Sequence, residues 1–194
     1  YIRPINRNHN WFTKKFKLED KIVILYSGNM GKTHSLFPLV EAAKQLNGKR
    51  EEFHFLFIGD GSGKKELVDF VDINRLINVL FLPYQSRQVL PFSFSTASYG
   101  VVSQSEGLES MSLPSKTFYY LAAGNAIISI SSKGSELYRL VQENKCGITI
   151  HPKNGYKDLV EQLIKIDNQL LFGYQKQSRI LSHQYSNSNV SQFI

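Results

Sequence analysis

The sequence is short of the features that mark secreted and membrane-spanning proteins. It has a single cysteine, Cys146, so no internal disulfide can form, and this is typical of a reducing compartment. No apolar run approaches the roughly 18 residues of a membrane span. Residues 1–10 are polar and basic, unlike a signal peptide. We therefore expect a cytoplasmic protein, and the absence of an initiator Met predicts a piece of a longer chain.

Patterns for metal binding and nucleophilic catalysis are also missing. The spacing of His and Cys residues fits no metal site, and no nucleophile–base pair can be argued from spacing. The histidines are scattered over the whole chain: His9, His34, His54, His151 and His183. We therefore predict no bound metal, and the catalytic residue stays unknown at this point.

Acidic residues are in the minority, most clearly at the two ends. The formal net charge is +7, residues 1–21 hold only Glu19 and Asp20 as acids, and Lys176 and Arg179 follow Asp167 with no further acid. Basic ends of this kind are typical of proteins that bind nucleic acid, an anionic membrane surface or a phosphate-bearing substrate. They are also found on ordinary basic surfaces that bind nothing. Because aromatic and basic residues do not alternate along any strand, nucleic acid is disfavoured as a partner.

Strand and helix patterns alternate from Lys21 onward. Strands are predicted over 22–26, 53–58, 78–82, 99–103, 126–130 and 147–150. Helices are predicted over 35–46, 64–73, 86–96, 114–123 and 134–143, with a last one through Leu159, Leu163 and Ile166. Apolar strands that alternate with helices indicate a parallel sheet covered on both faces. We predict an α/β fold: one Rossmann-like, three-layer domain with a parallel sheet of about six strands.

Ligands of such sheets bind beyond the carboxyl ends of the strands, so the loops there are the candidate sites. S-G-N-M-G-K-T-H (27–34) has glycines that let amides approach an anion, although a plain strand-to-helix turn would look the same. G-D-G-S-G-K-K (59–65) does not match a P-loop. In that loop Asp60 either binds a ligand or, as we favour, caps the next helix. In L-P-Y-Q-S (82–86), Tyr84 either stacks on a ring or covers the core edge.

The loop and helix S-L-P-S-K-T-F-Y-Y-L-A-A-G (112–124) carry the strongest signal. Pro114 suits the first helical position, and the amides of Ser115 and Lys116 then lack intrahelical acceptors. Lys116 adds a positive charge, so a phosphate at the helix mouth explains the pattern better than capping alone. The helix is expected to bury Phe118, Leu121 and Ala122 and to leave Ser115 and Tyr119 on another face.

Three segments together resemble a known family. Y-S-G-N-M-G (26–31), F-I-G-D-G (57–61) and L-P-S-K-T-F-x-Y-L-A-A-G-x-x-I-I (113–128) are similar to the carboxyl-terminal domain of family-four glycosyltransferases with the GT-B fold. The most similar branch is the bacterial one that builds O-antigen, capsule or exopolysaccharide. I-x-P-I-x-R-N-x-N (2–10) resembles the linker between the two domains of those enzymes. The resemblance covers residues 2–185.

The resemblance implies a division of the chain and a function for it. Residues 1–20 would be an interdomain linker, 21–168 the nucleotide-sugar-binding domain, and 169–194 a C-terminal helix and tail. The implied enzyme is a retaining glycosyltransferase of hexosyl or N-acetylhexosaminyl type, with a UDP-sugar as the expected donor and no tightly bound cofactor. The acceptor-binding domain and the catalytic residue would lie in the rest of the protein, so this part alone would be inactive. The acceptor would be lipid-linked, at the inner face of the cytoplasmic membrane.

The resemblance also implies a donor site built from the loops. The family has two glutamates spaced E-x7-E, and their positions hold Met111 and Tyr119 in this sequence. The family also clamps the diphosphate with an Arg and a Lys, and their positions hold Asn29 and His34. Lys116 is then the main remaining cation, with Lys32 second. These departures leave open a degenerate, non-catalytic module. A sugar-nucleotide epimerase of the same fold is a second alternative. The implied donor-site residues are Gly28, Asn29 and Gly31 at the diphosphate, Asp60, Gly61, Pro83 and Tyr84 at the base and ribose, Glu106 and Gly107 at the sugar, Leu113, Pro114, Ser115 and Lys116 at the phosphates, and Tyr119.

Overall fold

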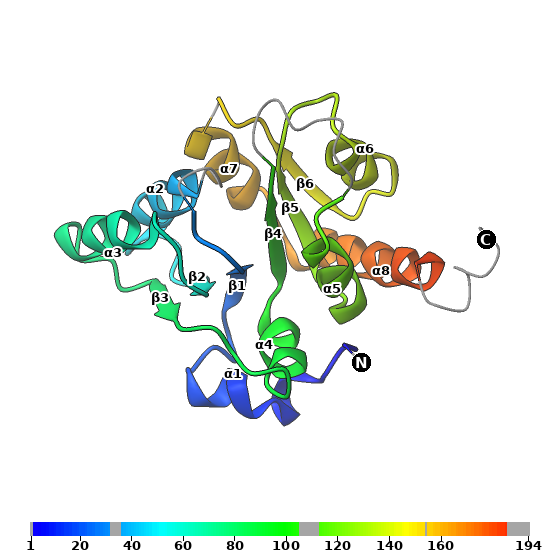
Figure 1. Cartoon of the computed structure of the whole chain (residues 1–194), viewed down its shortest axis with the longest axis horizontal. Coiled ribbons are helices and arrows are strands. Elements are labelled where there is room, and N and C mark those ends of the chain that lie inside the picture. The colour runs from blue at the N-terminus through cyan, green and yellow to red at the C-terminus, as the bar shows by residue number, and fades with distance from the viewer. Residues whose placement is uncertain (1, 32–35, 105–112, 154, 186–194) are drawn as a thin grey trace.

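One parallel sheet forms the centre of the molecule. The structure, a computed structural model, describes residues 2–31, 36–104, 113–153 and 155–185. The strands are β1 (Ile22–Ser27), β2 (Phe53–Ile58), β3 (Val79–Leu82), β4 (Tyr99–Ser103), β5 (Ala126–Ile130) and β6 (Gly147–Ile150). They pair in parallel in the order β3-β2-β1-β4-β5-β6 (Figure 1). The predicted sheet is confirmed, and each predicted strand lies within one residue of the observed one.

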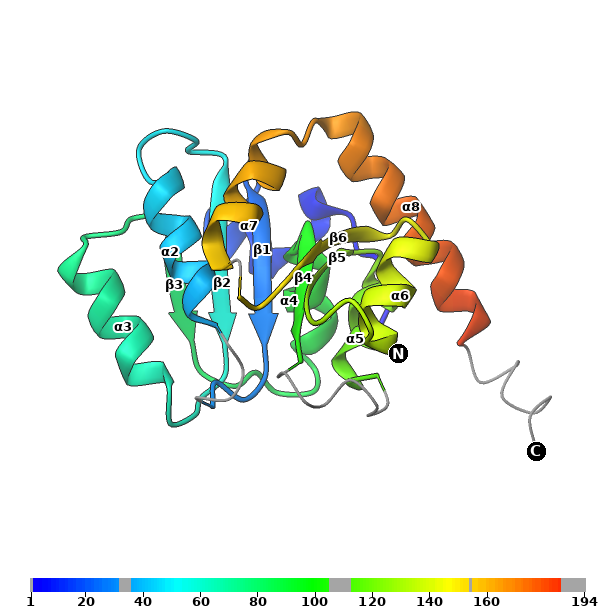
Figure 2. The same ribbon diagram turned by 90° about the horizontal axis from the view of Figure 1, so that it is seen from above.

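Helices cover both faces of the sheet (Figures 1 and 2). The first layer contains α2 (Phe37–Leu46), α3 (Lys64–Ile73) and α7 (Gly155–Ile164), and the second contains α1 (Trp11–Lys15), α4 (Leu90–Thr96), α5 (Lys116–Ala123) and α6 (Glu136–Glu143). The last helix, α8 (Asn168–Gln184), packs Leu171 into the first layer's core and Leu181 into the second's. Alternate strand residues face the two layers, so that in β1 Tyr26 belongs to the first core and Leu25 to the second. The predicted three-layer fold is confirmed.

Proline sets the beginning of two helices. Pro38 and Pro91 lie in the first turns of α2 and α4, where a missing N–H costs no helical hydrogen bond. As a result α4 begins at Leu90, four residues later than the sequence pattern predicted. Among the described helices, none combines the length and the apolar composition needed to cross a bilayer.

The leader, residues 2–20, is bound to the second layer. It contains a short 3-10 helix, Arg7–His9, and the helix α1. The buried Asn10 caps α1 by accepting from the amide of Phe12, and its side-chain amide donates to the carbonyl of Phe92 at 2.8 Å. The Arg7 guanidinium donates to the carbonyls of Leu18, Lys21 and Thr96. These bonds hold the leader on α4, while the division into linker, domain and tail stays a prediction.

Candidate functional site

The first two glycine loops touch each other at the carboxyl ends of β1 and β2. Figure 2 shows the arrowheads of β1, β2 and β3 pointing toward this edge of the sheet. Gly28, Gly59 and Gly61 have φ of +142°, +138° and +153°, values that L side chains rarely adopt. A Cβ on Gly59 would lie 2.0 Å from the Gly28 carbonyl oxygen, and one on Gly61 would lie 2.4 Å from Oδ1 of Asn29. Both loops therefore require glycine, and their contact brings backbone to the surface where a ligand would sit.

Asp60 folds back on its own loop. Its Oδ1 accepts a hydrogen bond from the Gly61 amide at 2.8 Å, and Nζ of Lys64 lies 4.0 Å from the same oxygen. The expectation that Asp60 caps α3 is wrong, because the N-cap residue is Gly63 and makes no side-chain cap bond. The carboxylate is largely exposed and stays within reach of a ligand on the loop.

Tyr84 lies on the surface beside these loops. Its side chain is 59% exposed, and its hydroxyl donates to the Asp60 carbonyl at 3.4 Å. A Cβ at Gly59 would lie 3.3 Å from its ring. The exposed ring therefore forms one wall of the candidate site, next to the exposed Pro83.

The helix α5 begins two residues later than predicted. Lys116 is its first residue, Ser115 is the N-cap without a side-chain cap bond, and Pro114 lies before the cap. The expected place of Pro114 in the first helical position is therefore wrong. Its carbonyl instead accepts from the Thr117 amide at 2.9 Å, which closes the first turn. The amides of Ser115 and Lys116 remain the first donors of the helix.

Lys116 connects α5 to the first glycine loop. Its Nζ lies 4.1 Å from the centre of the Tyr26 ring, and it would lie 2.8 Å from a Cβ on Gly28. Burial lowers the pKa of Lys116 to about 8. Within the part of the chain that the structure describes, no acidic side chain forms an ion pair with it. A partly desolvated cation at the first turn of a helix, with no ion-pair partner among the described residues, is suited to bind a phosphate.

The buried face of α5 differs from the predicted one. Phe118 and Ala122 are half-buried, and the buried side chains are those of Thr117, Tyr120, Leu121 and Ala123. Tyr120 is not among the residues that the helical pattern predicts to be buried. Its hydroxyl donates to the Leu25 carbonyl at 3.1 Å and accepts from the Ser27 amide at 2.9 Å. These two bonds to β1 fix α5, and with it Lys116, relative to the first loop.

Gly100 on β4 makes room for the Tyr120 ring. A Cβ on Gly100 would lie 2.1 Å from two ring carbons of Tyr120. We expect Gly100→Ala to lower the free energy of unfolding by about 1–3 kcal/mol, because a packed core yields little to an added methyl group. Urea unfolding measures this. Gly134→Ala is the control, since a Cβ there would meet nothing within 4 Å; equal stability of the two variants would contradict the packing argument.

Tyr119 lies on α5 one turn after Lys116. Its side chain is 47% exposed, as expected, and its ring packs edge-to-face with Phe94 of α4 at 5.9 Å between centroids. Ser115 is exposed, and Gly31 and Leu113 are half-buried. The structure therefore brings together the candidate residues on the first two loops, Tyr84 and Lys116. Five other candidates or replaced positions lie outside the described residues: Lys32, His34, Glu106, Gly107 and Met111.

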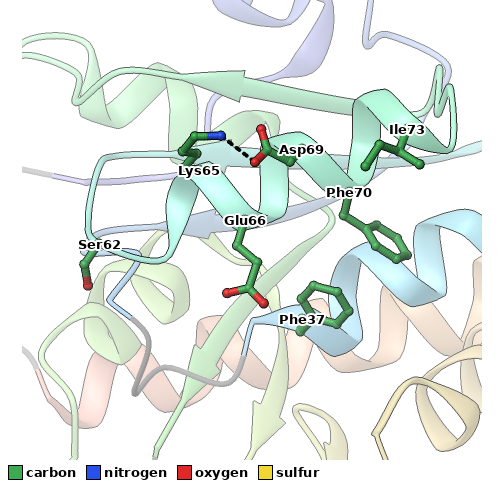
Figure 3. Close-up of a pocket in the computed structure, with 7 residues that line it drawn as sticks. All are labelled: Phe37, Ser62, Lys65, Glu66, Asp69, Phe70 and Ile73. Atoms are coloured by element: carbon green, nitrogen blue, oxygen red, sulfur yellow. Dashed lines mark hydrogen bonds and ion pairs between the residues drawn. The ribbon is translucent and has the colours of Figure 1, made fainter.

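Of the cavities lined by described residues, the two larger ones do not include the first glycine loop, Tyr84 or Lys116. One, of 510 Å³, lies between α2 and α3, where Phe37 contacts Phe70 and Lys65 pairs with Asp69 (Figure 3). Another, of 820 Å³, lies between the leader and α8, beside the chain segments that enter β4 and β5. A smaller one of 210 Å³ includes Gly31. We place the site by its chemistry, because ligands of open parallel sheets bind at the carboxyl ends of the strands, and Lys116, which has no ion-pair partner among the described residues, lies there.

Metal-ligand chemistry offers no alternative within the described residues, where no three His, Cys, Asp or Glu side chains gather.

The model of the family described as glycosyl transferases group 1 matches residues 8–184. The chain belongs to this family. The predicted family is thereby confirmed, on a match that includes both glycine loops and α5.

Two curated bacterial proteins are similar to this group 1 chain. The putative colanic acid biosynthesis glycosyl transferase WcaI of Escherichia coli K12 is 33% identical over 124 residues, which are 64% of this chain and 30% of that protein. The probable glycosyltransferase WbjE of Pseudomonas aeruginosa is 26% identical over 191 residues, 95% of this chain and 46% of that protein. The chain thus spans less than half the length of these relatives.

Solved structures share the fold. The C-terminal domain of the group 1 glycosyl transferase LpcC from Francisella tularensis matches with a TM-score of 0.75, 19% identity and 96% coverage of each chain. Anabaena Alr3699/HepE, in complex with UDP and glucose, matches with a TM-score of 0.77 and 13% identity, over 98% of this chain and 53% of that one. These likenesses confirm the predicted fold, one half of the GT-B architecture.

Proposed function

We propose that this group 1 chain is the donor-binding domain of a retaining glycosyltransferase of bacterial surface polysaccharide synthesis. The donor is a nucleotide-diphosphate sugar, with a UDP-sugar as the expected case. The observation that carries the proposal is Lys116, a cation without an ion-pair partner in the described residues, held against Gly28 at the carboxyl edge of the sheet.

The geometry supports a role for each part of the site. The backbone of the first loop, at Gly28 and Asn29, approaches the diphosphate because Gly28 has no side chain that would intervene. The Lys116 ammonium stabilises the negative charge that develops on the leaving diphosphate. Tyr84 offers an exposed ring on which the base stacks. The second loop, at Asp60, lies between the first loop and Tyr84 and reaches the ribose.

The relatives favour this assignment. Colanic acid biosynthesis is named for WcaI, and HepE binds UDP and glucose in its complex. We infer a similar donor for this chain, with transfer of hexosyl or N-acetylhexosaminyl type. The acceptor-binding domain and the catalytic residue then lie in the rest of the protein, so the 194-residue chain is expected to bind the donor without turnover.

The leader offers a surface for membrane contact. Trp11 is 42% exposed on α1, beside the exposed Lys14 and Lys15. An exposed aromatic ring flanked by lysines suits the interface of an anionic bilayer. We propose that the whole enzyme works in the cytoplasm at the inner membrane face on a lipid-linked acceptor. Nucleic acid is not a proposed partner.

The direct test is calorimetric titration of the chain with UDP, GDP and UMP. Binding of a nucleoside diphosphate, with UMP at least about tenfold weaker, is expected because the second phosphate carries the contact with Lys116. No heat of binding for any nucleoside diphosphate at millimolar concentration would contradict the proposal.

Tyr119→Glu separates a working variant site from a degenerate one. We expect UDP affinity to stay the same or fall, because the exposed Tyr119 ring packs on Phe94 and a carboxylate there adds negative charge near the diphosphate. Titration with UDP measures this. A severalfold gain in affinity would indicate instead that the chain has lost a functional glutamate and is a degenerate module. For the epimerase alternative, product analysis on the full-length enzyme decides.

A further inference from the structure

We propose that Tyr26 is a positioning residue of the donor site. Its buried ring holds the Lys116 ammonium against the first glycine loop, and its hydroxyl fixes the backbone of the same loop. One side chain thus positions both the cation and the loop backbone that meet the diphosphate. The inference rests on the proposed donor function and names a residue in that site with a role of its own.

The first contact joins α5 to the end of β1. Tyr26 is 1% exposed and belongs to the core of the first layer, whereas α5 lies in the second layer. Lys116 therefore reaches past the carboxyl end of β1, and its Nζ lies 4.1 Å from the centre of the Tyr26 ring. This is well within the roughly 6 Å over which a ring face attracts a cation. On its other side Nζ meets the Gly28 backbone, where a Cβ would be only 2.8 Å away.

The second contact joins the same phenol to the loop. The Tyr26 hydroxyl donates to the Asn29 carbonyl at 2.6 Å, a short hydrogen bond. Beyond Asn29, the Met30 amide donates to the Asp60 carbonyl at 2.8 Å, which ties the first loop to the second. The position of the Tyr26 ring therefore fixes the loop that lies over the ammonium.

An aromatic ring holds a cation without neutralising it. A carboxylate in this place would satisfy Lys116 and would compete with a phosphate, whereas the face of a neutral ring leaves the positive charge available. The polar groups nearest to the Tyr26 ring support this: burial raises the pKa of Tyr26 and of Tyr120 well above the ordinary value, so both are neutral, and Tyr84 also contributes a phenol. The charged groups of the second loop pair with each other, since Nζ of Lys64 lies 4.0 Å from Oδ1 of Asp60.

The chain offers a matched set of variants. Tyr26→Phe keeps the ring and removes the hydroxyl, and Tyr26→Leu removes both. Tyr99→Leu is the control, because Tyr99 is an equally buried phenol in the same core but lies at the start of β4, where it pairs with Ile24. Each variant is measured with and without Lys116→Met.

The first readout needs no ligand. A ring face 4.1 Å from Nζ shifts the NMR signals of the Lys116 ε-methylene protons upfield. We expect this shift in the wild type and in Tyr26→Phe and Tyr99→Leu, and its loss in Tyr26→Leu. An unshifted Lys116 in the wild type would overturn the contact on which the proposal rests.

The second readout is the affinity for UDP. We expect Tyr26→Leu to weaken binding about tenfold and Tyr26→Phe about threefold, with Tyr99→Leu within about twofold of the wild type. In the Lys116→Met background, Tyr26→Leu should cost no more than Tyr26→Phe, because the cation that the ring holds is gone. A merely structural Tyr26 would cost the same in both backgrounds.

The outcomes separate the two proposals. Unchanged UDP affinity in a folded Tyr26→Leu, or an equal loss with and without Lys116, overturns the positioning role and leaves the donor function standing. A wild type that binds no nucleoside diphosphate overturns the donor function, and the positioning role falls with it. If Tyr26→Leu does not fold, Tyr26→Phe decides: it must keep the ring shift and lose affinity, and unchanged affinity removes the hydroxyl's part in the proposal.

Discussion

Lys116→Met is expected to remove most of the affinity of this chain for UDP. Methionine keeps the apolar stem that lies by Tyr26 and loses only the charge. A hydrogen bond to a charged group contributes about 1.5–3 kcal/mol, so we expect binding to weaken about 10- to 150-fold. The loss should be near the upper end, because Nζ of Lys116 is the cationic group that a Cβ on Gly28 would meet, whereas Lys64 already donates to the Gly59 carbonyl at 3.1 Å. Calorimetric titration at pH 7 measures it.

The matched control is Lys165→Met. Lys165 follows α7, is largely exposed and pairs with Glu161 at 2.6 Å, far along the chain from the glycine loops. Lys165→Met removes one positive charge, as Lys116→Met does, so any general electrostatic attraction of UDP falls equally in the two variants. An affinity of Lys116→Met within twofold of that of Lys165→Met would contradict the assigned role of Lys116.

Gly59→Ala is expected to be the most destabilising single methyl addition at the site. The new Cβ would lie 2.0 Å from the Gly28 carbonyl oxygen, with φ at +138°. Neither backbone can move away, because Gly28 donates to the Ile58 carbonyl at 2.9 Å and Gly59 to that of Leu82 at 3.0 Å. We expect the free energy of unfolding to fall by more than about 4 kcal/mol, a loss that only a few mechanisms produce.

Urea unfolding of Gly59→Ala measures the effect against Gly173→Ala. Gly173 lies within α8, where a Cβ would meet nothing within 4 Å. Alanine there should stabilise the chain by about 0.5–1 kcal/mol, because glycine is a poor helix former. A Gly59→Ala variant as stable as the wild type would show that the two loops do not touch as described.

The sheet could be predicted closely because its signal is local. Each strand is a short apolar run bounded by polar or glycine residues. Because such strands are buried on both faces, they are apolar throughout and are recognised without an alternation of polar and apolar residues. The order of the strands is not local, since β1 pairs with β4 as well as β2. The alternation of strands and helices predicted a parallel sheet of about six strands, and the order of the strands was not predicted.

The site could be predicted in part. The glycine loops and Lys116 carry signals that a sequence shows: glycine after a strand, and a cation in the first turn of a helix. The functions of Tyr26 and Tyr120 could not be predicted, because both depend on contacts between segments about ninety residues apart. Asp60 was misassigned because a polar residue before a helix is a common cap, and here a glycine takes that position.

The predicted buried face of α5 was right only in part: Leu121 is buried as predicted, whereas Phe118 and Ala122 are half-buried. Periodicity selects the most apolar residues as the buried stripe, here Phe118, Leu121 and Ala122. The structure buries Tyr120 instead, because Gly100 leaves space under its ring and β1 offers partners for its hydroxyl. The sequence signal for this packing was Gly100, because a glycine within a strand often marks the close approach of another group.

The pH dependence of UDP binding follows from the state of Lys116. Its pKa of about 8 in the free chain lies below the ordinary value, so the ammonium is present below pH 8 and is lost as pH rises through 8. Bound diphosphate favours the charged form and raises that pKa. Affinity should therefore be level near pH 7 and fall progressively above pH 8, with a proton taken up on binding.

Calorimetry of UDP binding at pH 8.5, in two buffers of different ionisation enthalpy, tests the central claim most directly. About three quarters of the Lys116 side chains are neutral at that pH if the free pKa is about 8. We expect an uptake of up to this fraction of a proton per UDP bound, and none for Lys116→Met. UDP binding without proton uptake in the wild type, together with equal UDP affinity in Lys116→Met, would contradict the claim that Lys116 is the cation that meets the diphosphate.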